Sequence, residues 1–132
     1  MSLLHFQPIS GKTVSIINAI LQTEEVASVS RLLTTLYVVA EEIVVNVIDY
    51  SHSDYLDVEV LRDSQSITMR FRDGGLPFNP LKKDPPDITL PMEQRSIGGL
   101  GIFLVIAKMD TVNYEHTNGE NILTVTKTIE EE

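Results

Sequence analysis

Three glycines in four positions, Gly98, Gly99 and Gly101, precede an apolar run in the segment SIGGLGIFLVIAK, residues 96–108. A glycine-rich turn that leads into the N-terminus of a helix presents free backbone N–H groups and a favourable helix dipole to an anion. The chemistry that this pattern predicts is the binding of a phosphate. The alternative is a tight turn that only leads into a buried helix.

Two polar side chains, Glu42 and Asn46, interrupt the apolar segment AEEIVVNVIDY. Residues four apart lie on the same face of a helix, so these two side chains should point the same way. Burying an acid and an amide costs free energy unless something binds them. The pair therefore marks either a binding site or the solvent boundary of the helix, and the neighbouring Glu41 is expected to be solvated.

A third cluster is the segment RDGGLPFNP, residues 72–80. Asp73 closes an alternating segment, Gly74 and Gly75 permit unusual backbone angles, and a proline fixes the chain just before Phe78. A plain turn after a strand would explain this composition as well as a binding loop would.

Helical periodicity predicts the elements that position the first two clusters. Residues 13–22 and about 101–109 have the apolar spacing of helices. Residues 26–50 contain neither glycine nor proline, and their apolar residues repeat at three and four. The valines there favour a strand locally, but about 25 unbroken residues exceed the usual strand of 3–10, so we predict one long helix.

Alternation with period two predicts the strands. Residues 55–63 and 66–73 should form a hairpin, and residues 111–117 and 121–129 a second one around Asn118–Gly119. The opening LLHFQ predicts an edge strand, and residues 74–97 a long structured loop. This order of elements predicts an α+β fold with helices on one face of a mixed or antiparallel sheet.

Composition limits the class of protein. The chain has 132 residues, of which 42% are hydrophobic, which suits a single domain over 1–132. It has no cysteine, no apolar run long enough for a membrane span and no signal-peptide pattern, so we expect a cytoplasmic protein that binds no membrane. The net charge of −9 argues against direct nucleic-acid binding.

Taken together and in this order, the three clusters resemble the nucleotide-binding boxes of the GHKL ATPase superfamily, whose architecture is the Bergerat fold. The matching patterns are E-x-x-x-N on a helix, D-x-G-x-P-F after a strand and G-G-L-G-I before a helix. In finer detail, EEIVVNVIDYSH, DGGLPFNP and IGGLGIFLV resemble bacterial anti-sigma factor serine/threonine kinases of the RsbW and SpoIIAB type. The resemblance covers residues 26–127 and implies a two-layer α+β sandwich that binds ATP and Mg²⁺.

The resemblance also implies roles for single residues. Asn46 would hold Mg²⁺ through its side-chain oxygen, a hard ligand that suits this ion. Asp73 would accept a hydrogen bond from the adenine amino group, and Gly75 would let the backbone approach the base. The three glycines of residues 98–101 would bring backbone amides to the phosphates.

Further residues are implied in the nucleotide site. An ATP lid would span about 79–97, with Arg95 at its end meeting phosphate charge. Thr124 or Thr126 would join the network around adenine, and the sequence leaves that choice open. The remaining members of the implied site are Phe78 and Leu100.

In the kinases that this chain resembles, the glutamate at the position of Glu42 is the general base toward a serine or threonine hydroxyl of a partner. The implied partners are a small STAS-type anti-sigma antagonist and a sigma factor, and a homodimer is possible. Where such kinases often carry histidine, this chain has Tyr50, which we expect to pack against or orient its neighbours.

Two other functions stay open at this point. The chain can be a nucleotide-dependent binding module that sequesters a partner and transfers no phosphate. It can also be the ATP domain of a two-component histidine kinase, which we disfavour because the 132 residues show no preceding phospho-acceptor helical domain.

Overall fold

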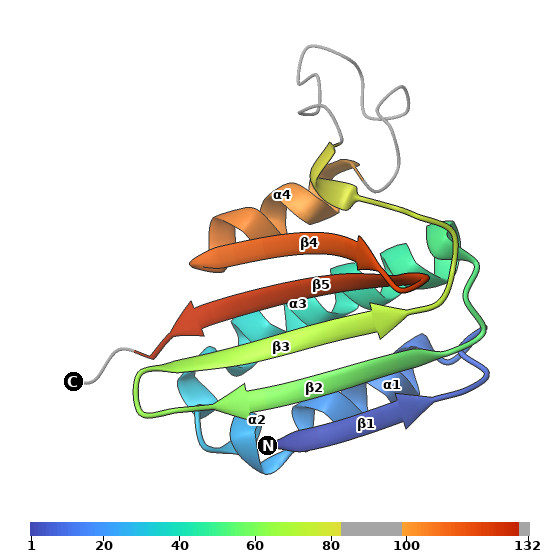
Figure 1. Cartoon of the computed structure of the whole chain (residues 1–132). Coiled ribbons are helices and arrows are strands. Elements are labelled where there is room, and N and C mark those ends of the chain that lie inside the picture. Colours follow the sequence, from blue (N-terminus) through green and yellow to red (C-terminus); the bar gives the residue numbers. More distant parts are fainter. Residues whose placement is uncertain (83–98, 130–132) are drawn as a thin grey trace.

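A computed structural model describes residues 1–82 and 99–129 of the chain (Figure 1). In this part of the chain, five strands form one antiparallel sheet with the order β1-β2-β3-β5-β4. The strands are β1 (Ser2–Phe6), β2 (Leu56–Arg62), β3 (Ser66–Asp73), β4 (Thr111–Thr117) and β5 (Glu120–Thr128). The four labelled helices lie on one side of this sheet, which confirms the predicted α+β arrangement.

The strands follow the predicted pattern closely. β2 and β3 form the first hairpin and β4 and β5 the second, while β1 lies at the edge beside β2. Asn118 and Gly119 both have positive φ, at 52° and 78°, as the turn between β4 and β5 requires. Along β3 every second side chain is buried, and the last buried position of that strand is Asp73.

The helical segments are α1 (Thr13–Leu21), α2 (Glu24–Ala27), η1 (Ser30–Leu32), α3 (Leu33–Asn46), η2 (Val47–Ser51), η3 (Pro80–Lys82) and α4 (Gly99–Lys108). Helices α1 and α4 correspond to predicted helices. Helix α3 contacts both of them and crosses behind the middle of the sheet. None of the helices within residues 1–82 and 99–129 is long and apolar enough to cross a membrane.

The prediction of one unbroken helix over 26–50 is wrong in its N-terminal part, whereas its C-terminal end agrees with the structure to within one residue. The helix is interrupted at Val29, whose backbone (φ −123°, ψ 50°) is not helical and whose side chain is buried. Beside it, the hydroxyl of Ser28 donates to the carbonyl of Glu25, a side-chain bond that competes with helical backbone bonding. At the other end, the chain widens into the π-helical turn η2 and stops at His52, which is left-handed with φ 60°.

The core lies between α3 and the centre of the sheet. Its members include Leu36, Val39, Ala40 and Ile43 of α3, and Met69, Phe71 and Val125 of β3 and β5. Apolar side chains at three- and four-residue spacing on α3 meet alternate side chains of the strands, so burial drives both patterns. This packing brings the C-terminal end of α3 to the end of β3.

Candidate functional site

A small cavity lies where α3 and the end of β3 meet. The side chains that line it are Ile43, Asn46, Val47, Phe71, Asp73, Phe78, Pro80, Tyr114, Asn121 and Leu123. Three of the residues singled out in the sequence, Asn46, Asp73 and Phe78, are therefore brought together here. Asn46 and Asp73 are only 6% and 3% exposed, so neither lies at a solvent boundary. Apolar walls with a few converging polar groups are typical of a small-molecule site.

The carboxylate of Asp73 is held in one orientation by two donors. Its Oδ1 accepts from the backbone N–H of Gly75 at 2.9 Å and from Nδ2 of Asn121 at 3.0 Å. A carboxylate has about four lone-pair positions, so these two bonds leave it able to accept from a ligand. This is the capacity that recognition of an amino group requires.

Asn121 is the residue of this site that the sequence reasoning missed. Its amide donates to Asp73 and to the carbonyl of Leu76 (2.8 Å), and its oxygen accepts from the N–H of Phe78 (3.0 Å) and the hydroxyl of Tyr114. These four bonds use the full capacity of an amide side chain. The signal in the sequence was a lone polar residue at the start of the apolar run NILTV, but only the pairing of β5 with β3 places it opposite Asp73.

The structure does not bring Thr124 or Thr126 to the cavity. Both lie on the sheet face away from the helices, where Thr124 accepts from Arg70 at 3.3 Å and Thr126 bonds to Thr68 at 3.1 Å. Side chains alternate between the faces of a strand, so a residue an odd number of positions after Asn121 must point away from the cavity. The position beside Asp73 belongs to Asn121.

Gly75 is needed because another backbone comes close. A Cβ on Gly75 would lie 2.1 Å from the carbonyl oxygen of Ser51, and the next residue, Leu76, donates its N–H to that same oxygen at 2.7 Å. In this structure the glycine thus admits the chain at the end of η2, a reason different from the approach of a base that the resemblance implied.

We predict that Gly75→Ala lowers the free energy of unfolding by about 1–3 kcal/mol, since the methyl group must displace backbone atoms. Urea unfolding followed by circular dichroism measures this change. The matched variant Gly119→Asn changes a turn with open space around it, and asparagine tolerates its positive φ, so it should cost much less. Equal stability of Gly75→Ala and wild type would contradict the close approach.

Glu42 lies beside the start of α4. A Cβ on Gly101 would come within 2.0 Å of Oε2 of Glu42, so a side chain at this position would push the Glu42 carboxylate out of its present place. The Glu42 side chain is half-buried, and burial first, then the charge of Glu41, raises the pKa of its carboxyl. Glu41, which we expected to be solvated, is also half-buried and bonds to the hydroxyl of Tyr37.

Phe78, which lines the cavity, stacks on a second aromatic ring. Tyr50 and Phe78 stack with their centroids 5.1 Å apart, which confirms that Tyr50 packs against a neighbour. The space left inside is about 20 Å³, room for about one water molecule. This space is too small for a purine base, so the cavity must widen before a base can enter it.

The remaining predicted residues lie at the start of α4 or precede it in the sequence. Gly99 is its first residue and Leu100 its second. Arg95, Gly98 and the lid segment from residue 83 onward fall outside the described residues.

The donors present fit a nucleotide with a divalent ion. Asn46 offers a hard amide oxygen at the cavity wall, and Asp73 offers a fixed carboxylate. Gly101 leaves room for the Glu42 carboxylate beside the start of α4.

Comparison with known proteins supports the binding of a nucleotide. Residues 11–127 match the family described as the histidine kinase-like ATPase domain. No curated protein matches the chain in sequence. Among solved structures, the histidine kinase AdeS of Acinetobacter baumannii is similar with a TM-score of 0.56 and 15% identity, covering 99% of this chain and 69% of that one. At this identity the likeness shows the fold alone. The family match covers most of the chain, and the chain therefore belongs to the histidine kinase-like ATPase domain family, whose members bind ATP.

Proposed function

We propose that this protein is an ATP-dependent serine/threonine kinase that phosphorylates a small antagonist protein of the STAS type and otherwise binds a sigma factor. The observation that carries the proposal is the position of Glu42. This residue of α3 lies one helical turn before Asn46, and its half-buried side chain lies beside the start of α4. A carboxylate there is close to the phosphate-binding end of the family's site but separate from Asp73.

Each residue has a distinct part in this reaction. Asp73 binds the adenine amino group, and Asn46 holds Mg²⁺, which neutralises phosphate charge when bound. Glu42 accepts the proton of the partner's hydroxyl as the hydroxyl oxygen bonds to the γ-phosphorus and the bond to the ADP oxygen breaks. Phosphoryl transfer depends mainly on positioning and charge stabilisation, so this small set of groups is sufficient.

The pH dependence of transfer tests the role of Glu42. A general base acts only when ionised, so the rate should fall as pH drops through the raised pKa of this carboxyl. Glu41→Gln removes the neighbouring negative charge, one of the two causes that raise the pKa of Glu42. The acid limb of the rate profile should therefore move to lower pH. Burial remains, so the shift is partial.

The measurement is kcat as a function of pH for the wild type and two variants. Glu115→Gln, which removes an exposed carboxylate on β4, serves as the control and should leave the limb in place. A limb that stays fixed or moves to higher pH in Glu41→Gln would show that Glu42 is not the titrating base.

The direct test adds the purified protein to source-cell extract with γ-labelled ATP and Mg²⁺, after ATP binding has been measured. Label on a small protein that survives acid would support the kinase and identify its substrate. Acid-labile label would indicate a histidine acceptor instead. ATP binding with no transferred label, in extract that contains the antagonist, would favour the module that only sequesters its partner.

A further inference from the structure

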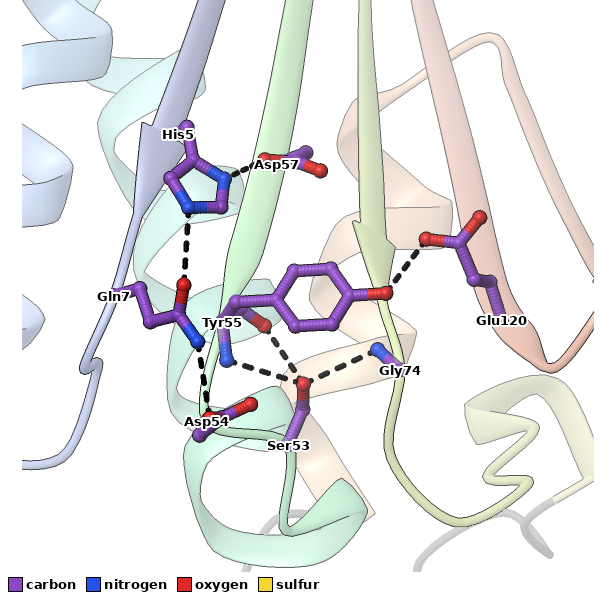
Figure 2. Close-up of polar contacts among 8 residues, drawn as sticks. All are labelled: His5, Gln7, Ser53, Asp54, Tyr55, Asp57, Gly74 and Glu120. Carbon is purple, nitrogen blue, oxygen red and sulfur yellow. Dashed lines mark hydrogen bonds and ion pairs between the residues drawn. The ribbon is translucent and has the colours of Figure 1, made fainter.

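Ser53 connects the segment before β2 to the loop that follows Asp73 (Figure 2). Its hydroxyl oxygen accepts from the N–H of Gly74 at 3.1 Å and from the N–H of Tyr55 at 3.2 Å, and it donates to the carbonyl of Tyr55 at 2.8 Å. One hydroxyl thus joins two segments that are far apart in sequence. The bonded glycine is the immediate neighbour of Asp73, so any movement of Ser53 acts directly on that loop.

Tyr55 extends from the same segment across Gly74 to β5. Its hydroxyl donates to Oε2 of Glu120 at 2.7 Å. A Cβ on Gly74 would lie only 2.7 Å from the Tyr55 ring and hydroxyl, so the ring rests directly on this glycine. On its other side, the ring stacks with His5 at a centroid distance of 6.2 Å. Tyr55 therefore covers the backbone next to Asp73 and is anchored beyond it.

The hydroxyl of Tyr55 keeps its proton at neutral pH, so it can donate to Glu120. The hydrogen bond to Glu120 is the main cause that raises the pKa of Tyr55 to about 12. Glu120 in turn precedes Asn121, the residue that donates to the Asp73 carboxylate. The bond thus runs from the residue before β2, past the end of β3, to the first residue of β5.

We propose that Tyr55 is a positioning residue for base recognition: together with Ser53 and Glu120, it fixes the Gly74 backbone so that the Asp73 carboxylate keeps one orientation. This inference rests on the binding of adenine by Asp73 under the proposed function. It predicts that Tyr55 controls both nucleotide affinity and the preference for adenine over guanine, although it does not line the cavity.

The test is Tyr55→Phe, which removes only the hydroxyl and keeps the ring over Gly74. Loss of one such bond should speed amide hydrogen exchange at Gly74 and Leu76 and raise the Kd for ATP, each by about three- to tenfold. The ratio of GTP to ATP Kd should fall by a similar factor, because guanine presents a carbonyl where adenine presents an amino group.

The chain offers a matched control and a rescue. Tyr37→Phe removes another tyrosine hydroxyl that bonds to a glutamate, Glu41, on the exposed side of α3. It should leave the amide exchange, the Kd for ATP and the ratio of GTP to ATP Kd unchanged. Glu120→Gln keeps an acceptor for the Tyr55 hydroxyl and should retain most of the discrimination, whereas Glu120→Ala should behave like Tyr55→Phe.

The outcomes separate this inference from the proposed function. Unchanged exchange, or an unchanged ratio of GTP to ATP Kd in Tyr55→Phe, would overturn the positioning role while the kinase proposal stands. Kd values that rise equally for both nucleotides would also overturn it, because they indicate general loosening. A wild-type protein that binds no ATP would overturn both.

Discussion

Replacing Glu42 with glutamine should lower the rate of phosphate transfer by about 10²- to 10⁴-fold, the usual contribution of a general base. Glutamine has nearly the same size and cannot accept the hydroxyl proton. It should therefore fit beside Gly101 as the native glutamate does. The binding of ATP should persist, because Asp73 and Asn46 are unchanged. Single-turnover transfer from γ-labelled ATP to the purified antagonist measures the rate, and calorimetry measures binding.

The control for this prediction is Glu115→Gln, which changes an exposed carboxylate and should transfer phosphate at the wild-type rate. If Glu42→Gln transfers phosphate within about threefold of wild type, a difference too small for the loss of a general base, another group must accept the proton. If it loses ATP binding together with transfer, Glu42 acts in binding and the proposed role is wrong.

Asn121→Ala should have the largest effect on stability, a loss of about 3 kcal/mol or more in the free energy of unfolding. The substitution removes four hydrogen bonds at once and leaves the buried Asp73 carboxylate and partly buried groups of Phe78 and Tyr114 without this partner. Each buried group that loses its partner costs about 1–3 kcal/mol, less where water can enter. The Kd for ATP should rise as well, because the Asp73 carboxylate loses one of its two fixed donors.

Urea unfolding and ATP titration of the same preparations measure the two effects. Asn113→Ala, an exposed asparagine on the neighbouring strand β4, should change stability by less than about 0.5 kcal/mol. If Asn121→Ala were as stable as this control, the four bonds would contribute nothing to the folded state. If its ATP affinity were that of wild type, Asn121 would not orient Asp73.

The sequence by itself determined most of the elements and which candidate site residues lie within them. The two hairpins, the edge strand and the helices α1 and α4 follow from patterns of period two and 3.6, because burial of one face imposes such a period on neighbouring residues. The spacing of Glu42 and Asn46 placed both on one face of α3 for the same reason. Asp73 was identified because it ends a strand just before two glycines.

The break in the predicted long helix at Val29 was decided by the tertiary structure. The segment lacks glycine and proline, the residues that most often stop a helix. Burial of Val29, with the side-chain bond of Ser28, stabilises the turn instead. Propensity is a weak preference that a buried contact can override.

The partners of the site residues were also decided only by the tertiary structure. Asn121 meets Asp73, and Thr124 does not, because of the order and register in which β3 and β5 pair. Gly75 meets Ser51, and Tyr55 reaches Glu120, because the segment before β2 folds against the loop after β3. A periodic pattern reports which way a side chain points within its own element. It carries no information about which distant backbone or side chain will lie opposite, since that depends on how the whole core packs.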